Sequence, residues 1–410
     1  MTMTINNEHK KLNVPNLRFP EFKGEWKKTT IGKIATIKNG PFGSVLHAED
    51  YVDEGMPIVT TEHFKNGNLP LSKNGIPQVS EDDYCRLKGY MLETDDIVFS
   101  RVGSVDINAH VEHVQQGWLF SGRVLRVRPI KSVNSLCLHY VLSTESVKRD
   151  IRNRAVGQTM PSINTPILSN TEIYMSQSEA EQKKIANLLS LLDERITTQS
   201  KIIEDLKKLK SAIIEKHYGQ AEKLIAYVAD LGESFSVGNL AKEDLTETGI
   251  PCVIYGELFT TYGETILQIE SHTNKTESMV LSKKGDLLFP SSTTVDAMSL
   301  IAPSVINVDG VILGGDMFGI HINHNYNAQY LSYYFNHIAK RQLAKYAKGS
   351  TIIHLHYTDI KKAKLSLPYL EEQNRMAKCL VILDDKIKVE NSLLNLLNSQ
   401  KAYLLCKMFI

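Results

Sequence analysis

The sequence predicts an α+β protein in which two similar globular α/β domains are joined by two long helices that form an antiparallel coiled coil, with pseudo-two-fold symmetry. Three observations predict this fold: the same series of sequence blocks occurs twice, each copy ends in a long amphipathic segment, and the two segments carry matched polar interruptions. The predicted parts are an N-terminal arm (1–20), a first globular domain (21–178), a first long helix (179–218), a second globular domain (219–370) and a second long helix (371–410).

The composition is typical of a folded chain with two or three domains. Of the 410 residues, 42% are hydrophobic and 23% are charged, which argues against a disordered chain. The net charge is only +1, so we do not expect the protein to coat nucleic acid by charge alone. Local basic patches, offset by acidic stretches elsewhere, remain compatible with this balance.

Cysteine use and hydropathy indicate a cytoplasmic protein. The five cysteines are scattered and none belongs to a C-x-x-C pair, which suggests reduced thiols rather than a disulfide framework. No run of about 18 apolar residues occurs, so no membrane span is expected. The N-terminal segment is polar and lacks the apolar core of a signal peptide, so we expect a loose arm there.

Five sequence blocks occur in both copies and in the same order. GMPIVTTEHF begins at Gly55, and GIPCVIYGELF begins 194 residues later at Gly249. LETDDIVFSRVGS, around Asp96, corresponds to LSKKGDLLFPSST, around Asp286. The other pairs are LHYVL with LSYYF, VGQTMPSIN with KGSTIIHLH, and SEAEQKKIANLLSLLDERI with YLEEQNRMAKCLVILDDKI. Coincidence among common apolar patterns would explain one such pair, but five in one order indicate a duplication.

Each copy predicts the same order of elements. Short β-rich runs come first, punctuated by Gly, Pro and Asn: IVTTEHF, DIVFSRVG and RVLRVRP in the first copy, and CVIYGELF, DLLFPSST and MFGIHIN in the second. A helix follows in each, SLCLHYVLSTESVKRDIRNR or AQYLSYYFNHIAKRQLAKYA. A glycine loop, one more strand (TEIYMS or AKLSLP) and a long helix complete the copy.

The two long helices are predicted from uninterrupted heptad-like spacing. Neither segment contains Pro or an internal Gly, and each would be about 60 Å long. Their apolar residues recur at alternating steps of four and three, which predicts the seam of a coiled coil. The seam residues are Ile185, Leu189, Leu192, Ile196, Ile203, Leu206 and Ile213 in the first helix, and Met376, Leu380, Leu383, Ile387, Leu394, Leu397 and Leu404 in the second.

Polar residues interrupt both seams at equivalent places. Gln199 and Lys210 interrupt the first, and Glu390 and Lys401 the second, 191 residues later in each case. Polar seam residues reduce stability but fix the register of paired helices, so we expect Gln199 to face Glu390. The alternative is that each helix packs only on its own domain, which is the more common fate of an amphipathic helix. The length and the matched interruptions favour a mutual coiled coil.

Together these features resemble the specificity (S) subunit of type I restriction–modification enzymes, over about residues 20–410. The motifs that carry the resemblance are WKKTTIGKIATIKNGPFGS, the G-x-P-x-V strand, DDIVFSR, the glycine loop and the E-Q-x-x-I/M start of each long helix. One region departs from the internal match, because SFSVGNLAKEDL stands where the first copy has TIKNGPFGSVLHAED. Residues cannot be transferred one by one across that loop.

The resemblance implies a non-catalytic subunit that gives a multisubunit enzyme its DNA specificity. Each globular copy would be a target recognition domain for one part of a bipartite double-stranded DNA target, and the helices would set the spacer. The helices would also dock two methyltransferase (M) subunits, and restriction (R) subunits would join that core. The chain itself would bind no cofactor, since S-adenosylmethionine, ATP and Mg would belong to the partner subunits.

The first DNA-binding candidates lie on the basic helix before each glycine loop. They are Lys148, Arg149, Arg152 and Arg154 in the first copy, and Lys340, Arg341, Lys345 and Lys348 in the second. Phosphate contact and a plain solvated helix face are both consistent with this pattern, although its repetition supports contact.

Further candidates lie on loops and strand ends. The glycine loops contribute Gln158, Thr159, Ser350 and Thr351, whereas Gly157 and Gly349 themselves are expected to be ordinary helix C-cap glycines. The first glycine-containing loop contributes Lys38, Asn39 and Ser44, and the strand ends contribute Arg101, Ser104, Ser292, Thr293 and Thr294. Arg101 is suited to bidentate reading of guanine, with a buried ion pair as the alternative. Arg126 and Arg128 alternate on one strand face and are expected to face solvent.

Several catalytic motifs are missing from the sequence. It has no phosphate-binding G-x-x-x-x-G-K-[ST] loop, no [ND]-P-P-[YF] tetrapeptide, no dinucleotide fingerprint and no Cys/His zinc spacing, so we assign no catalytic residue and no metal site. Two alternatives remain open: a coiled-coil assembly scaffold that binds only protein, and a fused enzyme with a disguised active site. The DNA sequence read, the spacer length and the presence of an active R subunit are not encoded in any motif here.

Overall fold

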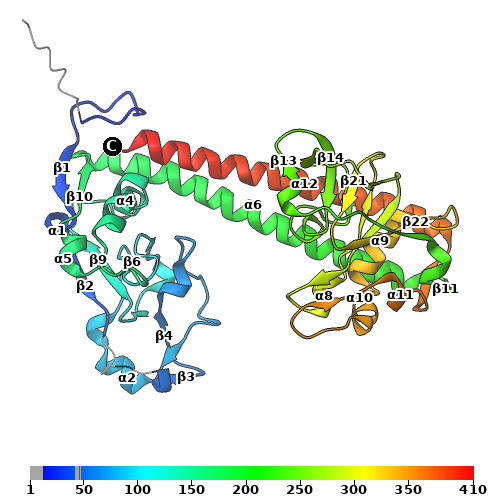
Figure 1. The fold of residues 1–410 in the computed structure, drawn as a ribbon. Helices are drawn as coiled ribbons and strands as arrows, with labels where there is room; N and C mark the ends of the chain where they lie inside the picture. The colour runs from blue at the N-terminus through cyan, green and yellow to red at the C-terminus, as the bar shows by residue number, and fades with distance from the viewer. Residues whose placement is uncertain (1–12, 42–45, 47) are drawn as a thin grey trace, which may run out of the picture. The chain divides into compact units, whose positions relative to one another are not determined.

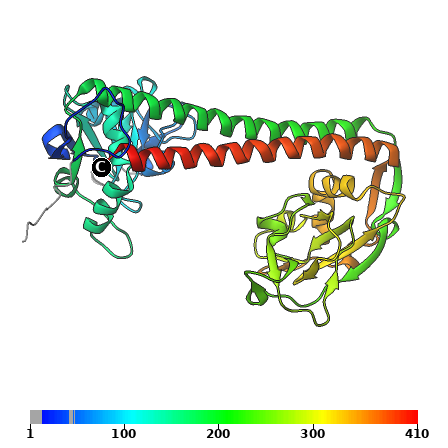
Figure 2. The ribbon, with the colours of Figure 1, turned by 90° about the horizontal axis from the view of Figure 1, so that it is seen from above.

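The computed structural model describes residues 13–41, 46 and 48–410 (Figures 1 and 2). The chain divides into two compact units, each of which contains one globular domain and part of both long helices. Unit 1 runs to Gln199 and includes Leu393–Ile410, and unit 2 is Ser200–Ser392. No helix in the described part of the chain has the length and apolar character needed to span a membrane.

Unit 1 is built on two four-stranded sheets and a strand pair. The first sheet has the order β2 (Ala35–Asn39), β9 (Val124–Pro129), β6 (Ile97–Ser100), β7 (Asn108–His110). The second has the order β3 (Tyr51–Val52), β5 (Gln78–Val79), β4 (Met56–Val59), β8 (Leu119–Phe120), and the pair is β1 (Lys27–Thr30) with β10 (Glu172–Met175). The helices of its globular part are α1 (Ile31–Ile34), α2 (Glu81–Arg86), α3 (Ser135–Leu142), α4 (Glu145–Arg154) and α5 (Thr165–Ser169).

Unit 2 is built on two five-stranded sheets and two strand pairs. The first sheet has the order β12 (Gly232–Ser236), β22 (Met317–Ile322), β18 (Asp286–Pro290), β20 (Ser304–Ile306), β15 (Thr265–Ile266). The second has the order β13 (Leu245–Thr246), β16 (Ser271–Thr273), β14 (Ile250–Ile254), β21 (Ile312–Gly314), β17 (Val280–Leu281). The pairs are β11 (Lys223–Tyr227) with β24 (Lys364–Pro368) and β19 (Ser292–Thr293) with β23 (Ile353–His354). The helices are α7 (Glu257–Thr260), α8 (Ala297–Leu300), α9 (Ala328–His337), α10 (Lys340–Leu343) and α11 (Tyr357–Ile360).

The sheets confirm the duplication that the sequence predicts. The order β2-β9-β6-β7 in unit 1 matches β12-β22-β18-β20 in unit 2, and all of these neighbours are antiparallel. The parallel pair β4–β8 matches the parallel pair β14–β21. The pair β1–β10 likewise matches β11–β24, so the same frame is built twice from diverged sequences.

The single helix predicted before each glycine loop is broken in both units. In unit 1 it is divided into α3 and α4, and in unit 2 into α9 and α10. The break in unit 1 follows from Ser143 and Thr144, whose hydroxyls donate to the carbonyls of His139 at 2.9 Å and Val141 at 2.7 Å. Such back-bonding competes with the regular helix, and Thr144 then stands as the N-cap residue of α4.

The two long helices are α6 (Glu179–Gln220) and α12 (Leu370–Met408). Figures 1 and 2 show them side by side, and within each unit the early part of one runs against the late part of the other, which confirms the antiparallel arrangement. Burial follows the heptad pattern, since Leu189, Ile203 and Leu380 are buried. Gln199 and Glu390 are also buried, but they belong to different units, so their pairing stays a prediction.

The ends of the long helices are part of the domain cores. In unit 1 the core that contains Trp26 also takes in Ile185 and Leu189 of α6 and Met408 and Phe409 at the end of α12. In unit 2 the core takes in Ile214 from α6 and Met376, Ala377 and Leu380 from α12. The alternative in which each helix packs on its own domain is therefore correct for the first turns of each helix. The late turns of each helix pack into the other copy's domain.

The described part of the N-terminal arm is not loose, contrary to the expectation. Arg18 makes a bidentate ion pair with Glu181 of α6, at 2.6 and 2.8 Å, and the Glu181 side chain has no exposed surface. Trp26 also donates to this carboxylate, at 3.4 Å. The Leu17 amide donates to the Lys407 carbonyl at 2.8 Å. Residues 13–20 therefore belong to unit 1, because Glu181 needs the guanidinium of Arg18 to compensate its buried charge.

Candidate nucleic-acid interface

In unit 1 the end of strand β6 lies directly against the glycine loop. Val102 and Ser162 form an antiparallel bridge, and the Gly103 amide donates to the Pro161 carbonyl at 2.9 Å. Arg101 donates from Nε to the Ile163 carbonyl at 3.3 Å. The structure thus brings together two groups of candidates that are far apart in the sequence, Arg101 and Ser104 with Gln158 and Thr159.

Unit 2 repeats this arrangement with a regular strand pair. Ser292 of β19 lies opposite His354 of β23, and Thr293 lies opposite Ile353. The candidates of this surface are Ser292, Thr293, Thr294, Ser350 and Thr351. Of these, Thr294, Ser350 and Thr351 are exposed, whereas Thr293 is half-buried and Ser292 is buried. In each unit, therefore, one strand end and one glycine loop present short polar side chains from a single surface, which we call the strand-end surface.

The loop glycines are not helix C-caps, so that interpretation is wrong. The C-cap of α4 is Ala155, two residues before Gly157, and Gly157 has a φ of 102° inside a loop closed by a Val156–Ser162 bridge. Gly349 has a φ of 115° in the matching loop, and a Cβ there would lie 2.0 Å from the Ile352 carbonyl oxygen. Only glycine fits, because the chain turns back on itself in a left-handed conformation.

The basic helix is partly neutralised in unit 1. Arg152 pairs with Asp106 and Glu145, and Arg154 pairs with Asp150 at 3.0 Å. In unit 2, Lys348 pairs with Asp359 at 2.6 Å. Because carboxylates already neutralise Arg152, Arg154 and Lys348, these side chains are weaker candidates for binding DNA phosphate.

The equivalent pairs Lys148 with Arg149 and Lys340 with Arg341 make no ion pair within the described residues, and Lys345 makes none either. Arg149, Arg341 and Lys345 are exposed, whereas Lys148 and Lys340 are half-buried. The cations available for phosphate are therefore the two pairs that occur in both copies, together with Lys345 of unit 2.

The three DNA-binding candidates on the first glycine-containing loop, Lys38, Asn39 and Ser44, differ in their surroundings. Lys38 donates from Nζ to the Gly89 carbonyl at 2.7 Å and lies 4.7 Å from the centre of the Tyr90 ring, so it fastens β2 to its own domain. The buried Oδ1 of Asn39 has no hydrogen-bond partner among the described residues. Ser44 lies outside the described residues.

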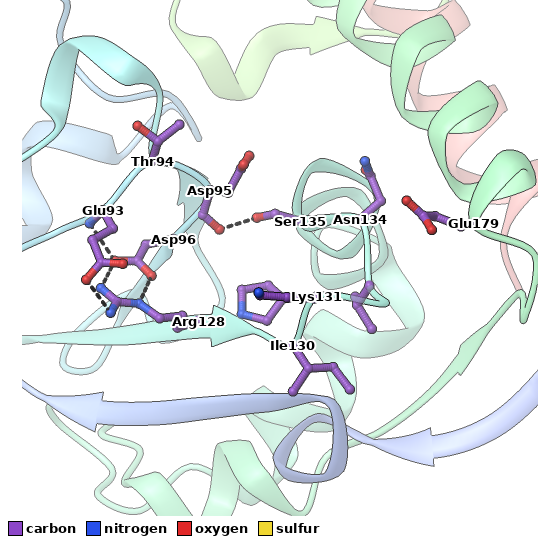
Figure 3. Close-up of a pocket in the computed structure, with 12 residues that line it drawn as sticks. Glu93, Thr94, Asp95, Asp96, Arg128, Ile130, Lys131, Asn134, Ser135 and Glu179 are labelled. Atoms are coloured by element: carbon purple, nitrogen blue, oxygen red, sulfur yellow. Dashed lines mark hydrogen bonds and ion pairs between the residues drawn. The ribbon is translucent and has the colours of Figure 1, made fainter.

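Arg126 and Arg128 are half-buried and bonded within their domain, contrary to the expectation that they face solvent, and Arg126 donates to the Met91 carbonyl at 3.3 Å. Arg128 forms a bidentate pair with the buried Asp96, at 2.6 and 2.8 Å, in a cleft of about 740 Å³ that is lined by several carboxylates (Figure 3). In unit 2, Asp286 pairs with His321 at 2.6 Å in the equivalent place. The aspartate of the DDIVFSR block therefore anchors the first sheet, and the acidic cleft is unsuited to phosphate.

The glutamine in the E-Q-x-x-I/M motif connects each long helix to its domain. Gln182 accepts from the Asn134 amide at 2.8 Å and donates to the Ser176 carbonyl at 2.8 Å. Gln373 accepts from the Asn327 amide at 3.0 Å and donates to the Pro368 carbonyl at 2.8 Å. Both asparagines are N-cap residues, of α3 and α9. The motif therefore fixes how the helix leaves the last strand.

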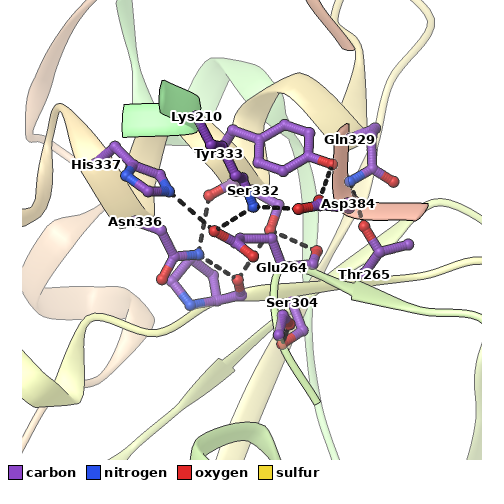
Figure 4. A network of polar contacts seen from close by, with 12 residues as sticks. Lys210, Glu264, Thr265, Ser304, Gln329, Ser332, Tyr333, Asn336, His337 and Asp384 are labelled. Atoms are coloured by element: carbon purple, nitrogen blue, oxygen red, sulfur yellow. Dashed lines mark hydrogen bonds and ion pairs between the residues drawn. The ribbon is translucent and has the colours of Figure 1, made fainter. Parts of the chain in front are cut away.

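A Lys–Asp–Tyr contact joins both long helices to each domain, and we call it the junction triad. In unit 2 Lys210 of α6 pairs with Asp384 of α12 at 2.6 Å, and Tyr333 of α9 donates to the same carboxylate at 2.5 Å (Figure 4). Burial, followed by the nearby Asp384 charge, raises the pKa of Tyr333, so the phenol remains a donor. The triad of unit 2 thus uses one residue from each of three helices.

Unit 1 contains the equivalent triad. Lys401 of α12 pairs with Asp193 of α6 at 2.5 Å, and Tyr140 of α3 donates to Asp193 at 2.8 Å. The sequence pattern singled out Lys210 and Lys401 as interruptions of the seam but missed their partners. The 191-residue spacing from Asp193 to Asp384 carries the signal that would have found them.

Unit 2 adds Glu264 to its triad. The carboxylate lies 3.0 Å from Lys210 and 2.9 Å from His337 (Figure 4). Burial alone would raise the pKa of Glu264, but the hydrogen bond from His337 and the charge of Lys210 outweigh it and lower that pKa to about 2. A carboxyl with a lowered folded-state pKa contributes stability above its ordinary value of 4.5 and loses that contribution as the pH falls to about 2.

We expect Glu264→Gln to destabilise unit 2 by about 3 kcal/mol at pH 7 and by roughly half as much at pH 3, where the folded-state carboxyl, with its pKa of about 2, is still mostly ionised. Denaturant unfolding of the variant and the unchanged protein at both pH values, followed by hydrogen exchange in α9, measures this difference. Glu270→Gln is the matched control, because Glu270 is exposed in the same unit. An equal cost at pH 7 and pH 3 would contradict the assignment.

Among the described residues, no group of three or more His, Cys, Asp or Glu side chains is arranged to hold a metal ion.

Comparison with known proteins finds the same family model in both copies of the repeat. A family model described as the type I restriction modification DNA specificity domain matches twice, over residues 23–208 and 229–399. A putative type I restriction enzyme MjaX specificity subunit of Methanocaldococcus jannaschii is 25% identical over 420 residues, 93% of this chain and 92% of that protein. The crystal structure of a type I restriction-modification S subunit from M. genitalium has a TM-score of 0.63 at 17% identity, covering 97% of this chain and 99% of that one. A chain from a structure on complex assembly and conformational transition of the type I system has a TM-score of 0.54 at 14% identity, covering 94% and 97%.

Proposed function

The chain belongs to the family of type I restriction modification DNA specificity proteins, as a specificity subunit with two target recognition domains, and we propose that the strand-end surfaces make its contacts with DNA. The observation that carries the proposal is that both units build the same surface on the same backbone frame, with different side chains. A constant frame with variable side chains is what two readers of different half-sites require. The family assignment argues against a scaffold that binds only protein.

The basic residues that occur in both units would bind the DNA phosphates and so position each domain on the duplex. Lys148 and Arg149 lie on α4, and Lys340 and Arg341 occupy the equivalent positions at the start of α10. Contacts to phosphate carry no sequence information but fix the register of a reader on the duplex. A cation at the same place in both units fits phosphate contact, because that contact does not depend on which bases each unit reads.

Chemistry in this assignment belongs to partner subunits. The chain lacks the sequence motifs of an ATP motor and of an adenine methyltransferase, and its relatives are named specificity subunits. Two methyltransferase subunits with S-adenosylmethionine, and restriction subunits with ATP and Mg, would supply methylation and cleavage. The assembly would act in the cytoplasm, where the DNA is. Methyl transfer by the purified chain alone would establish the fused-enzyme alternative instead.

The exposed face of α12 supports docking of a methyltransferase subunit. Large side chains seven residues apart are exposed in each unit: Ile382 and Val389 in unit 2, at 70% and 61%, and Leu396 and Tyr403 in unit 1, at 68% and 57%. Within each unit this spacing places the two side chains on one face of the helix, away from the buried seam. An apolar stripe of this kind on an exposed helix is typical of a protein interface.

We expect Ile382→Asp combined with Leu396→Asp to reduce recovery of the methyltransferase subunit on the purified specificity subunit at least tenfold. The isolated chain should keep its stability, because both positions are exposed. Co-purification of the two proteins measures the effect. The exposed Asp385→Asn is the control on the same helix, and unchanged recovery of the double variant would rule out this face.

The experiment that tests the function is to map methylated adenines in DNA from cells that contain this chain and its methyltransferase partner. We expect a split motif with a fixed gap, because two readers joined by paired long helices would read two separated half-sites. A continuous motif, or none, would contradict the proposal. Absence of duplex protection, even with methyltransferase subunits present, would favour the scaffold alternative.

Lengthening both helices should change the gap and leave the half-sites intact. One heptad inserted between Gln199 and Ser200, and another between Ser392 and Leu393, adds about 10 Å to each helix and keeps the seam in phase. The methylated motif should then show a gap longer by a few base pairs. The heptad in α6 alone is the control and should disrupt the pairing. An unchanged gap in the double insertion would show that the helices do not set the spacing.

A further inference from the structure

Backbone hydrogen bonds identify an equivalent pair of positions at the edge of each strand-end surface. In unit 1 the Arg101 amide donates to the Arg123 carbonyl at 3.0 Å, and the Ile163 amide donates to the Arg101 carbonyl at 2.9 Å. In unit 2 the Ser291 amide donates to the Asp316 carbonyl at 2.7 Å, and the Leu355 amide donates to the Ser291 carbonyl at 2.9 Å. Arg101 therefore corresponds to Ser291, and Arg123 corresponds to Asp316.

The two cations of unit 1 line one cleft. Arg101 and Arg123 face a cavity of about 520 Å³ that is also lined by Thr60, Thr61 and Ser121. Arg101 is half-buried and is held by the carbonyls of Gly122 at 3.1 Å and Ile163 at 3.3 Å. Arg123 is exposed and makes no ion pair with the part of the chain that the structure describes. The carboxylate in the cleft, Glu62, is paired with Lys65, so the cleft keeps a positive charge.

The charge is inverted in unit 2. Ser291 is buried and neutral, and the half-buried Asp316 brings a carboxylate to the position of Arg123. Within the described residues no lysine, arginine or histidine pairs with Asp316. The same backbone frame therefore presents hydrogen-bond donors in unit 1 and an acceptor in unit 2.

The opposite charges of Arg123 and Asp316, at equivalent backbone positions, indicate contact with bases rather than with phosphates. Both half-sites carry the same phosphate backbone, so a phosphate contact would need a cation in both units. Base edges differ, and in the major groove guanine presents the acceptors O6 and N7, whereas cytosine presents the N4 amino donor. Arginine matches guanine with a bidentate contact, and a carboxylate accepts from cytosine.

We propose that Arg123 and Asp316 are base-specificity determinants, with Arg123 reading guanine in the half-site of unit 1 and Asp316 reading cytosine in the half-site of unit 2. This rests on the proposed function and names the base chemistry of its strand-end surfaces. Arg101, fixed by two carbonyls, adds a second donor group beside Arg123. Ser291 leaves the matching space in unit 2 without a competing charge.

The test is to map methylated adenines with the complete methyltransferase complex that carries Arg123→Ala, Arg123→Gln or Asp316→Asn. Either Arg123 variant should make one guanine of the first half-site degenerate, with a loss of discrimination of about 10- to 100-fold, and leave the second half-site unchanged. Asp316→Asn, which keeps the shape of the side chain, should do the same at one cytosine of the second half-site. Arg154→Ala is the matched control, because Asp150 already pairs with this cation of unit 1.

Four outcomes would overturn all or part of the assignment. A split motif that the Arg123 variants leave unchanged rules out reading by Arg123, and one that Asp316→Asn leaves unchanged rules out reading by Asp316. Weaker methylation of all sites with the same motif would make Arg123 a phosphate contact. A wild-type motif that is not split would overturn the proposed function, and this assignment with it.

Discussion

Replacement of Lys210 by alanine should destabilise unit 2 by about 3–5 kcal/mol, because it removes the cation from a largely buried cluster of charges. The Lys210 side chain is 8% exposed and contacts two carboxylates, Asp384 at 2.6 Å and Glu264 at 3.0 Å. Without Lys210, the contact that Asp384 keeps among the described residues is the hydrogen bond from Tyr333. Denaturant unfolding, with hydrogen exchange to locate the change in α9 and α12, measures the cost.

Lys208→Ala is the matched control for this prediction. It removes a lysine from the same helix, but Lys208 is exposed and its ion pair among the described residues is with Glu204, so the cost should be small. The double variant Lys210→Ala with Asp384→Ala should recover part of the loss, since no unpaired carboxylate then remains at the α12 position. If Lys210→Ala costs no more than Lys208→Ala, the junction triad does not hold the domain.

The same substitution should affect DNA reading in one half-site. The junction triad joins both long helices to the domain of unit 2, so its loss should loosen that domain while unit 1 keeps the triad of Lys401, Asp193 and Tyr140. Methylation should therefore tolerate mismatches in one half-site only. Lys401→Ala should have a smaller effect in unit 1, because its side chain is 29% exposed.

Phe409→Ala should destabilise unit 1 by about 3–5 kcal/mol, the usual cost of removing a large aromatic side chain from a core. Phe409 is 6% exposed and packs edge-on against Trp26, with 6.0 Å between the ring centres. This contact closes the core of the first domain with the residue that directly follows α12. Urea unfolding followed by tryptophan fluorescence measures the cost, since Trp26 is one of only two tryptophans.

Ile410→Ala is the control next to it, because Ile410 is 37% exposed and lies outside the core cluster. Its cost should stay below about 1 kcal/mol. A Phe409→Ala variant as stable as Ile410→Ala would show that the end of α12 does not support the first domain.

The long helices were predictable because their signal is local. Heptad spacing and the absence of Pro predict a helix over 179–218, and α6 is Glu179–Gln220. The second was predicted over 371–410, and α12 is Leu370–Met408.

The roles of individual polar residues were less predictable, because their contacts join distant parts of the chain. Lys38 and Arg128 are fastened by Gly89 and Asp96, which lie 51 and 32 residues away.

The glycine loops show the same limit on a smaller scale. A glycine shortly after a helix predicts a C-cap from sequence, but Gly157 is needed where the chain turns back to bridge Val156 with Ser162. Strand pairing decides the position of that turn, and pairing partners are not written in the neighbouring residues.

The sequence by itself determined the duplication, the two long helices and the equivalence of Lys210 with Lys401, because a repeat is found by comparing the chain with itself and helical periodicity is a property of neighbouring residues. Only the tertiary structure decided that each of these lysines meets an aspartate and a tyrosine, that strand ends join the glycine loops, and that Arg123 stands where unit 2 has Asp316. Those relations join segments that are distant in the sequence, and a side chain's charge acquires its role only from the groups that folding places beside it.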